Sequence, residues 1–191
     1  MVLVLMITTG FWGGALSLVK KATEKQIEYQ RIKHIKAPAI KKVLVVSYDN
    51  DPVKDRIRVE IGKNKRGKPI YKNIFLAKKN NKIVAVVIEG FGSGYKDRIG
   101  VMVSILLPEE KIGSIAITTH SETPGVGTRA IESKEFMSQF KSKPITVNFT
   151  PTGGVIKAVS GATYTSNGIM LAVQNAVNIY KKVKSALGLK N

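Results

Sequence analysis

The segment SGATYTSNGIMLAVQNAVNIYKKVKSAL, residues 160–187, carries the clearest structural signal in this chain. Apolar side chains recur in it at helical spacing, at Ile169, Val173, Val177, Tyr180 and Val183. Gly188 follows where a glycine commonly ends a helix. The spacing predicts an amphipathic helix over residues 167–187, which must bury its apolar side against another layer of structure.

The chain before this helix supplies the other layer. Short runs rich in valine and isoleucine predict strands over residues 43–47, 56–61, 70–77, 82–89, 98–107 and 114–119. Turn residues separate these runs, and such short connections favour antiparallel neighbours. A short helix is predicted over 132–141 and a further strand near 144–149. The fold class is therefore α+β, with a largely antiparallel sheet and the C-terminal amphipathic helix packed on it.

The N-terminal residues 2–19, VLVLMITTGFWGGALSLV, contain no charge and are nearly long enough to cross about 30 Å of hydrocarbon as a helix. We expect residues 1–19 to be a retained transmembrane anchor. A signal peptide would show a basic start and a small-residue cleavage site, and a buried core helix would show a polar face. Gly10 and Gly14 share one helix face and would allow close packing of another helix, although glycine is common in membrane helices.

Residues 20–42 are basic and predicted to be helical up to Pro38, forming a juxtamembrane linker. Their positive charge suits lipid phosphates, and a solvated basic helix is the alternative. Residues 43–191 then form the globular domain.

The composition excludes several functional classes. The 191 residues contain no cysteine, so disulfides and Cys-ligated iron–sulfur clusters are excluded, and a redox role needs an organic cofactor. His34 and His120 match no metal-ligand spacing, so we expect no metal site. The net charge of +18 suits nucleic acid or an anionic membrane, but the basic residues form no dominant cluster. We expect no nucleic-acid partner.

The start of the C-terminal helix is the strongest candidate for chemistry. A helix N-terminus carries free N–H groups and a partial positive charge, which stabilise a bound phosphate. Hydroxyl and amide side chains crowd this point, at Ser160, Thr163, Thr165, Ser166 and Asn167. Serine and threonine are also favoured as ordinary helix caps, which is the structural alternative.

The run Ser160-Gly161-Ala162-Thr163, followed by Tyr164-Thr165-Ser166, resembles the flavinylation motif of the RnfG/NqrC family of FMN-binding subunits. In that family the threonine of this motif carries FMN through a phosphoester bond, which implies covalent FMN at Thr163. The resemblance covers nearly the whole chain and is closest to RnfG.

Two further blocks are similar to this family. The block Glu122-Thr123-Pro124-Gly125-Val126-Gly127 resembles its Glu-Thr-Pro-Gly-Leu-Gly signature beside the flavin, and residues 90–95 resemble a glycine-rich turn. Proline and glycine at these positions predict a tight, rigid loop. The resemblance implies that the flavinylation motif and the Pro-Gly block both contact FMN. The implied FMN-binding residues are Ser160, Gly161, Ala162, Thr163, Tyr164, Thr165 and Ser166 of the motif, and Glu122, Thr123, Pro124, Gly125, Val126 and Gly127 of the block. His120 and Arg129 are better explained as a strand-end residue and a surface residue.

One position departs from the family pattern. The motif usually has aspartate three residues before its serine, where this chain has Lys157. In the family that aspartate belongs to the pattern read by the flavin transferase, which delivers the FMN moiety from FAD with magnesium. The departure affects the expectation of covalent attachment more than that of the FMN-binding fold.

The resemblance implies an electron-transfer subunit with covalent FMN, in an Rnf-type membrane complex that couples ferredoxin:NAD oxidoreduction to sodium or proton translocation. Such a subunit is part of an oxidoreductase but has no catalytic residue set of its own. The implied partners are the other membrane, flavin and iron–sulfur subunits, and a flavin transferase for maturation. An NqrC-like subunit of a sodium-pumping NADH:quinone reductase is the alternative. A basic membrane-surface protein without flavin is a more distant one.

The resemblance also implies a single-pass protein of the inner membrane, with the flavin domain on the extracytoplasmic side. Lys20 and Lys21 follow the apolar segment and by charge alone favour a cytoplasmic C-terminus. We follow the family on this point, because packing in a complex overrides a weak charge bias.

Overall fold

The computed structural model describes residues 1–64 and 66–189 and divides the chain into two units, Met1–Ala37 and Pro38–Asn191. The first unit contains helix α1, Val2–Arg31, and the π-helical turn η1, Ile32–Lys36. Within α1, Val2–Glu24 is long and apolar enough to cross a membrane, with a mean hydropathy of 1.9. Its side chains make few contacts with the rest of the described chain.

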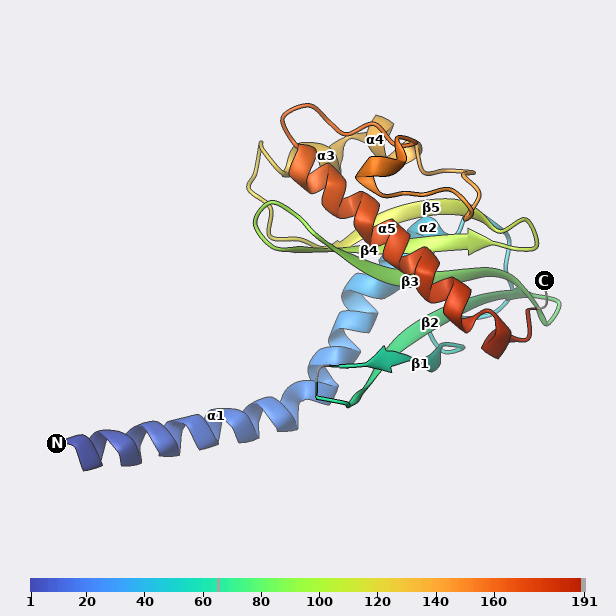
Figure 1. Ribbon diagram of the computed structural model, residues 1–191. Helices are drawn as coiled ribbons and strands as arrows, with labels where there is room; N and C mark the ends of the chain where they lie inside the picture. Colours follow the sequence, from blue (N-terminus) through green and yellow to red (C-terminus); the bar gives the residue numbers. More distant parts are fainter. Residues whose placement is uncertain (65, 190–191) are drawn as a thin grey trace. The chain divides into compact units, whose positions relative to one another are not determined.

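The second unit is built on one antiparallel sheet whose strands follow chain order from β1 to β5 (Figure 1). The strands are β1 Ile57–Lys63, β2 Pro69–Lys79, β3 Lys82–Ser93, β4 Arg98–Leu106 and β5 Lys111–Thr119. Each of the five was predicted from its valine and isoleucine run. Connections of a few residues join them, which is why each strand pairs with its neighbour in sequence.

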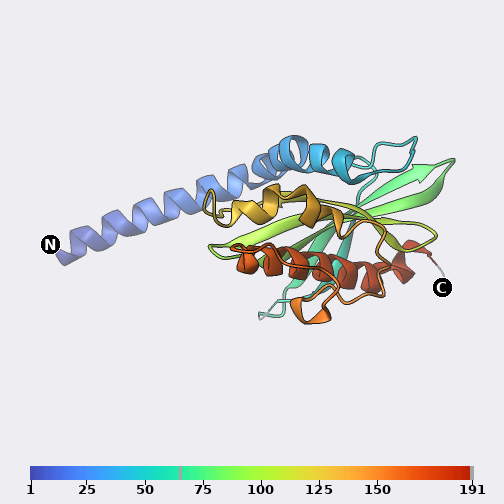
Figure 2. The same cartoon turned by 90° about the horizontal axis from the view of Figure 1, so that it is seen from above.

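Both faces of the sheet are covered. The long helix α5, Thr163–Val183, lies on one face and the short helix α2, Ala37–Val43, on the other (Figure 2). Side chains alternate along each strand, so one set packs on α5 and the other on α2. In β4, Val101 and Val103 belong to the core under α5, whereas Met102 belongs to the core under α2.

Glycines in β3 set how closely α5 packs on the sheet. A methyl group on Gly90 would collide with the carbonyl oxygen of Ala172, and one on Gly92 would collide with that of Gly168. The block 90–95, expected to be a turn, is therefore mostly strand. Its glycines serve close helix packing, and only its end, at Gly94 and Tyr95, lies in the turn to β4.

The predicted strand 43–47 is wrong. Val43 ends α2, and residues 44–56 form a loop instead of a strand. A short run of buried apolar residues has the same pattern in a helix end as in a strand. The helical run also continues past Pro38. The π-helical turn η1 leads directly into α2, and the N–H of Ala37 bonds to the carbonyl of Ile32, so the regular α-helical hydrogen-bond ladder is already interrupted where proline lacks its N–H.

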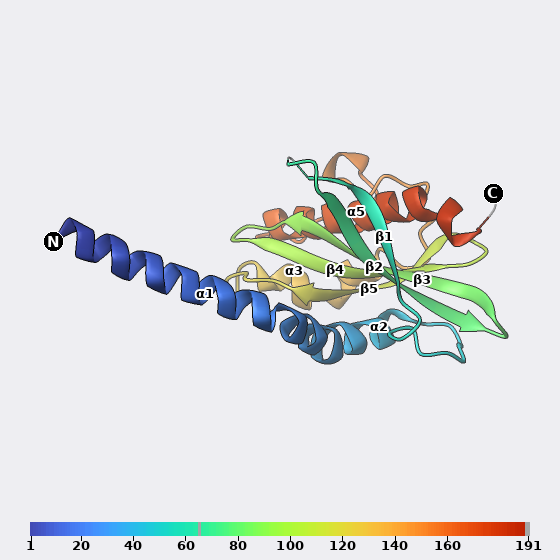
Figure 3. The same cartoon turned by 90° about the horizontal axis from the view of Figure 1, so that it is seen from below.

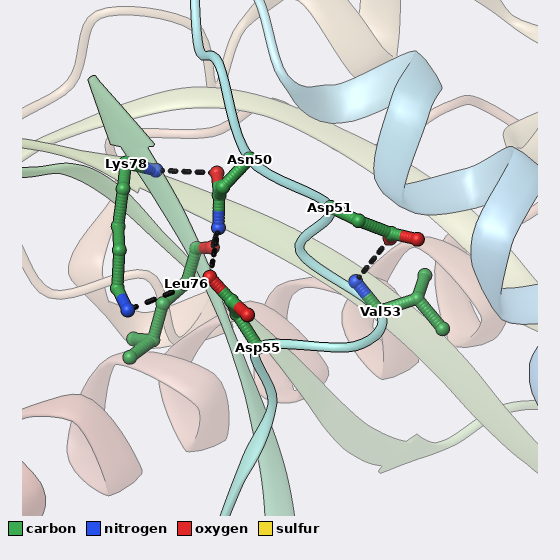
Figure 4. Close-up of polar contacts among 6 residues, drawn as sticks. All are labelled: Asn50, Asp51, Val53, Asp55, Leu76 and Lys78. Carbon is green, nitrogen blue, oxygen red and sulfur yellow. Dashed lines mark hydrogen bonds and ion pairs between the residues drawn. The ribbon is translucent and has the colours of Figure 1, made fainter. Parts of the chain in front are cut away.

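Asn50 holds this loop against β2 (Figure 4). Its amide donates to the carbonyl of Leu76 at 2.8 Å and accepts from the N–H of Lys78 at 2.7 Å. It also donates to Asp55, which lies 3.5 Å from the ammonium of Lys78. One side chain thus provides hydrogen-bond partners to the part of β2 that lies beyond the first residue of β1.

Two predictions near the C-terminus need correction. Residues 144–149 form an isolated bridge at Pro144 and then turns, not a strand. The helix expected over 132–141 is two short helices, α3 Thr128–Glu132 and α4 Lys134–Ser138, because Ser133 between them is extended and caps α4. The two remaining short turns are η2 Pro151–Gly153 and η3 Ser185–Leu187.

Candidate functional site

Helix α5 begins at Thr163, four residues before the predicted start at Asn167. The first helical hydrogen bond runs from the N–H of Ser166 to the carbonyl of Ala162, at 2.9 Å. No side-chain cap closes this end of the helix, and Gly161 precedes it with a φ of +77°. The N–H groups of the first turn therefore lack partners within the helix and are available to an anion.

The two threonines of the motif have different environments. Thr163 is exposed at the helix start, whereas Thr165 is 1% exposed and donates its hydroxyl to Glu122. Of these two hydroxyls, only that of Thr163 is accessible to a ligand or a modifying enzyme. The geometry thus favours Thr163 over Thr165 as an attachment point.

Ser166 holds the motif together from within. It is fully buried, its hydroxyl donates to the carbonyl of Ala162 at 2.9 Å, and it accepts from the N–H of Val159 at 3.0 Å. These bonds fix the turn 159–162 on the first turn of α5. Ser166 is thus placed to support the site, whereas Ser160 is exposed beside Thr163.

Glu122 connects the two motif blocks. Its carboxylate is 5% exposed and accepts from the hydroxyl of Thr165 and from the N–H groups of Tyr95 and Lys96, at 3.3 and 3.1 Å. Gly94 and Gly127 leave room for it, since a methyl group on either would collide with a carboxylate oxygen. One buried side chain therefore joins the turn after β3, the loop after β5 and helix α5.

The environment keeps Glu122 ionised. Burial acts to raise its pKa, but hydrogen bonds from Thr165 and from the backbone N–H groups of Lys96, Tyr95 and Asp97 outweigh burial, and the pKa lies below its usual range. The carboxylate carries a fixed negative charge at neutral pH, just below the surface of the site.

The Pro-Gly block forms a compact loop, as predicted. The carbonyl of Thr123 accepts from the N–H groups of Val126 and Gly127, at 3.3 and 3.1 Å. Gly125 has a φ of +75°, and its N–H donates to the hydroxyl of Thr128 at 3.0 Å. The outer part of the loop is exposed, including the side chains of Pro124 and Val126.

Apolar side chains stand exposed around this loop and the helix start. The rings of Tyr95 and Tyr164 lie 6.0 Å apart between centroids and are 64% and 71% exposed, and Val126 is 49% exposed. Tyr95 was not among the predicted site residues, although the glycine block that precedes it was noticed. Two exposed rings beside a helix N-terminus offer contact to a flat aromatic ligand.

Arg129 lies closer to the motif than its sequence position suggested. A side chain on Gly161 would meet a guanidinium nitrogen of Arg129, so this exposed cation lies directly over the turn before Thr163. Arginine recognises phosphate through paired N–H donors. The two residues are 32 positions apart in sequence, and only the folding of α3 against α5 brings them together.

Lys157, which replaces the family's aspartate, has a fixed backbone and an exposed side chain. Its N–H donates to the amide oxygen of Gln139 at 2.8 Å, and its carbonyl accepts from the same amide at 3.1 Å. His120 is also exposed. Among the residues that the structure describes, no group of histidine, aspartate or glutamate is arranged to hold a metal ion.

Comparison with known proteins shows what this domain is similar to. Residues 94–178 match the model of a family described as FMN-binding domain. A protein of Clostridium ljungdahlii, named as part of a proton-translocating ferredoxin:NAD(+) oxidoreductase complex, is 34% identical over 110 residues, which cover 56% of this chain and 58% of that protein. A protein of Methanosarcina acetivorans, named as part of an ion-translocating oxidoreductase complex, is 26% identical over 181 residues, covering 93% of this chain and 91% of that protein.

The fold has a counterpart among solved structures. The crystal structure of NqrC of Shewanella oneidensis matches with a TM-score of 0.52 at 22% identity, covering 74% of this chain and 76% of that chain. At this identity the likeness concerns the fold alone. It confirms the predicted arrangement of an antiparallel sheet under a C-terminal helix.

Proposed function

We propose that this chain is a protein of the RnfG/NqrC type and the electron-transfer subunit of an Rnf-type membrane complex, because residues 94–178 match an FMN-binding domain family and two relatives named as parts of ion-translocating oxidoreductase complexes are similar to it. The observation that carries the proposal is the exposed hydroxyl of Thr163 at an uncapped helix start, with the guanidinium of Arg129 beside it.

FMN is attached through a phosphoester to Thr163. The free N–H groups of the first turn of α5 would hold its phosphate, by hydrogen bonding and by the helix dipole. Arg129 adds a positive charge beside Gly161. Lys157 does not obstruct this arrangement, because its exposed side chain leaves the turn intact.

Tyr95, Tyr164 and the loop 123–127 would hold the flavin ring. The exposed tyrosine rings and Val126 provide apolar contact. Glu122 holds the supporting backbone in place from below. The fixed negative charge of this carboxylate disfavours additional negative charge on a nearby ring.

FMN supplies the one- and two-electron redox chemistry when bound. The chain itself fixes the position of the ring, and the ester keeps the cofactor from dissociating. A carrier that only passes electrons needs no acid–base pair or nucleophile. The site accordingly consists of two tyrosine rings, a glycine-containing loop and the start of helix α5, which together would bind the cofactor.

The membrane organisation follows from the sequence boundaries. Residues 1–19 anchor the chain in the inner membrane as a single span, residues 20–42 form a basic juxtamembrane linker, and residues 43–191 form the FMN-binding domain. The domain lies on the extracytoplasmic side. The length and hydropathy of Val2–Glu24 support the anchor.

The partners are the membrane, flavin and iron–sulfur subunits of the complex, which couples ferredoxin:NAD oxidoreduction to sodium or proton translocation. The names of the curated relatives support this reading over an NqrC-like subunit, because one relative belongs to a ferredoxin:NAD(+) oxidoreductase and both belong to ion-translocating complexes. A flavin transferase attaches the cofactor. The chain works as a part of this oxidoreductase and not as an enzyme by itself.

Intact-mass and peptide analysis tests the attachment. The full chain is expressed with its flavin transferase, and we expect a mass increase of one esterified FMN that maps to the peptide containing Thr163. Thr163→Ala should abolish the covalent flavin, whereas Ser160→Ala, a matched change of a neighbouring exposed hydroxyl, should retain it. Covalent flavin in Thr163→Ala would place the ester on another residue, and wild-type protein without any flavin would refute the proposal.

A further inference from the structure

A basic cavity lies beside the second half of α5, away from the motif. Its volume is about 610 Å³, and its walls come from β1, β2, the end of β3, the start of β4 and α5. Cavities of this size, within roughly 300–1,000 Å³, are typical of small-molecule sites.

The cavity exists because β2 and β3 separate at one end of the sheet. The pairing of β2 with β3 ends at Ile74 and Ile88, whereas β3 continues to pair with β4 as far as Ser93 and Arg98. The hairpin of β1 and β2 curls toward the side of the sheet that carries α5 (Figures 2 and 3). The amide of Asn175 on α5 donates to the carbonyl of Phe91 at 2.7 Å, so the helix satisfies a backbone group of β3.

Four cationic side chains line the cavity: Lys72, Arg98, Lys181 and Lys182. No carboxylate is among the described residues that form its wall. Lys72 and Arg98 lie over the ring of Phe91, at 4.2 and 4.6 Å from its centroid. The ring holds these cations in place, so their positive charge is organised before any ligand arrives.

Other parts of the wall suit a ligand with an organic body. Two asparagine amides provide neutral donors and acceptors, and isoleucines of β1 and α5 provide apolar surface. A bare phosphate ion would fill only a small part of the volume. A phosphate ester would place its anion among the cations and its organic part against the apolar wall.

We infer that this cavity binds the phosphate group of a small phosphate ester, either a soluble nucleotide or the headgroup of an anionic phospholipid. The site is separate from the flavin. Lys181 follows Thr163 by 18 positions on one helix, a separation of about 27 Å along its axis. Ligand binding here does not require that the flavin proposal be correct.

The test uses the purified full chain in detergent and ADP as the soluble probe, measured by isothermal titration calorimetry at low salt. We expect one saturable site whose affinity falls as salt is added. Arg98→Gln combined with Lys182→Gln should weaken ADP binding about tenfold or more, because two charge-assisted contacts are lost.

A matched control removes the same two charges elsewhere. Arg66→Gln combined with Lys141→Gln changes one exposed arginine and one exposed lysine outside the cavity, and should leave the ADP affinity within about twofold of wild type. Asn178→Asp is a second test, which adds a negative charge to the wall without changing the side-chain shape. It leaves the cation–ring contacts of Phe91 in place and should also weaken ADP binding.

Nanodiscs distinguish the two sources of phosphate. If the ligand is a lipid headgroup, replacing phosphatidylcholine by phosphatidylglycerol should lower the ADP affinity, and native mass spectrometry should find phosphatidylglycerol on the wild type and the control but not on the cavity variant. An ADP affinity equal in both lipids assigns the site to soluble nucleotides. The inference is overturned if neither ADP nor phosphatidylglycerol distinguishes the cavity variant from the control.

The flavin content of the same samples separates this inference from the proposed function. The cavity variant should carry as much covalent flavin as wild type, and Thr163→Ala should bind ADP with unchanged affinity. Loss of ADP binding in Thr163→Ala would show that the probe occupies the flavin site and would refute a separate cavity site.

Discussion

Two threonines of one motif show how burial assigns a role to a residue. Thr163 and Thr165 are two positions apart, so they point to different sides of α5. Thr163 is exposed, whereas Thr165 donates to the buried carboxylate of Glu122. The two threonine hydroxyls are chemically alike, and they differ in their exposure to solvent. Glu122 in turn is a positioning residue, since its contacts are to backbone and to Thr165.

Glu122→Gln should lower the free energy of unfolding by about 2 kcal/mol at neutral pH, because an ionised acceptor of several hydrogen bonds is lost. The pKa of Glu122 is depressed in the folded chain. Its contribution is therefore present above the unfolded value of about 4.3 and is lost as the pH falls through the lower folded value. Urea unfolding of both proteins between neutral and acidic pH should show the difference shrinking below that value.

Glu132→Gln is the control for this prediction, because Glu132 is exposed at the end of α3. Its effect should be small at each pH. A Glu122→Gln protein as stable as wild type at neutral pH would contradict the role assigned to the carboxylate.

Helix α5 performs three tasks along its length. Its first turn presents free N–H groups, its middle packs on the strand glycines, and its last turns provide Lys181 and Lys182 to the basic cavity. The close packing of the middle matters for the first turn. It fixes the helix start against the turn after β3, where Gly168 meets Ser93 and Gly94.

Gly90→Ala should destabilise the domain by about 1–3 kcal/mol, because the added methyl group forces α5 away from β3. The carbonyl oxygen of Ala172 stands where that methyl would lie, and a helix backbone cannot move aside alone. Thermal unfolding by circular dichroism measures the effect. Ser93→Ala, on an exposed residue of the same strand, should change stability by less than about 0.5 kcal/mol. Equal melting temperatures for Gly90→Ala and wild type would show that α5 does not need this contact.

At the scale of the whole molecule, the chain joins an apolar helix to a basic domain. The net charge of +18 and the apolar span of Val2–Glu24 both suit a protein at an anionic membrane. The charge just after the span and the family resemblance favour opposite sides for the domain. A direct measurement of topology therefore tests the proposed orientation.

Cysteine labelling provides it, because the sequence contains no cysteine that would give a background. Lys141→Cys places one thiol on an exposed position after α4. In intact cells we expect a membrane-impermeant maleimide to label it fully, as it would any thiol outside the cytoplasm. Protection until the cells are lysed would put the domain in the cytoplasm and reverse the proposed orientation.

Much of the architecture could be predicted from local pattern. The strands β1 to β5 and the helix α5 show strong periodicity over many residues, and they were found where expected. The errors at 43–47 and 144–149 concern short apolar runs, which pack equally well in a helix end, a turn or a strand. There the surrounding core decides the conformation.

The sequence by itself determined the order of strands and helix, the apolar N-terminal span and the two motif blocks, because each is a pattern of neighbouring residues. Only the tertiary structure decided that Glu122 binds Thr165, that Arg129 lies over Gly161 and that the parting of β2 from β3 gathers four cations around one cavity. These contacts join residues distant in sequence. Their geometry depends on how closely α5 packs on the sheet, which no single segment specifies.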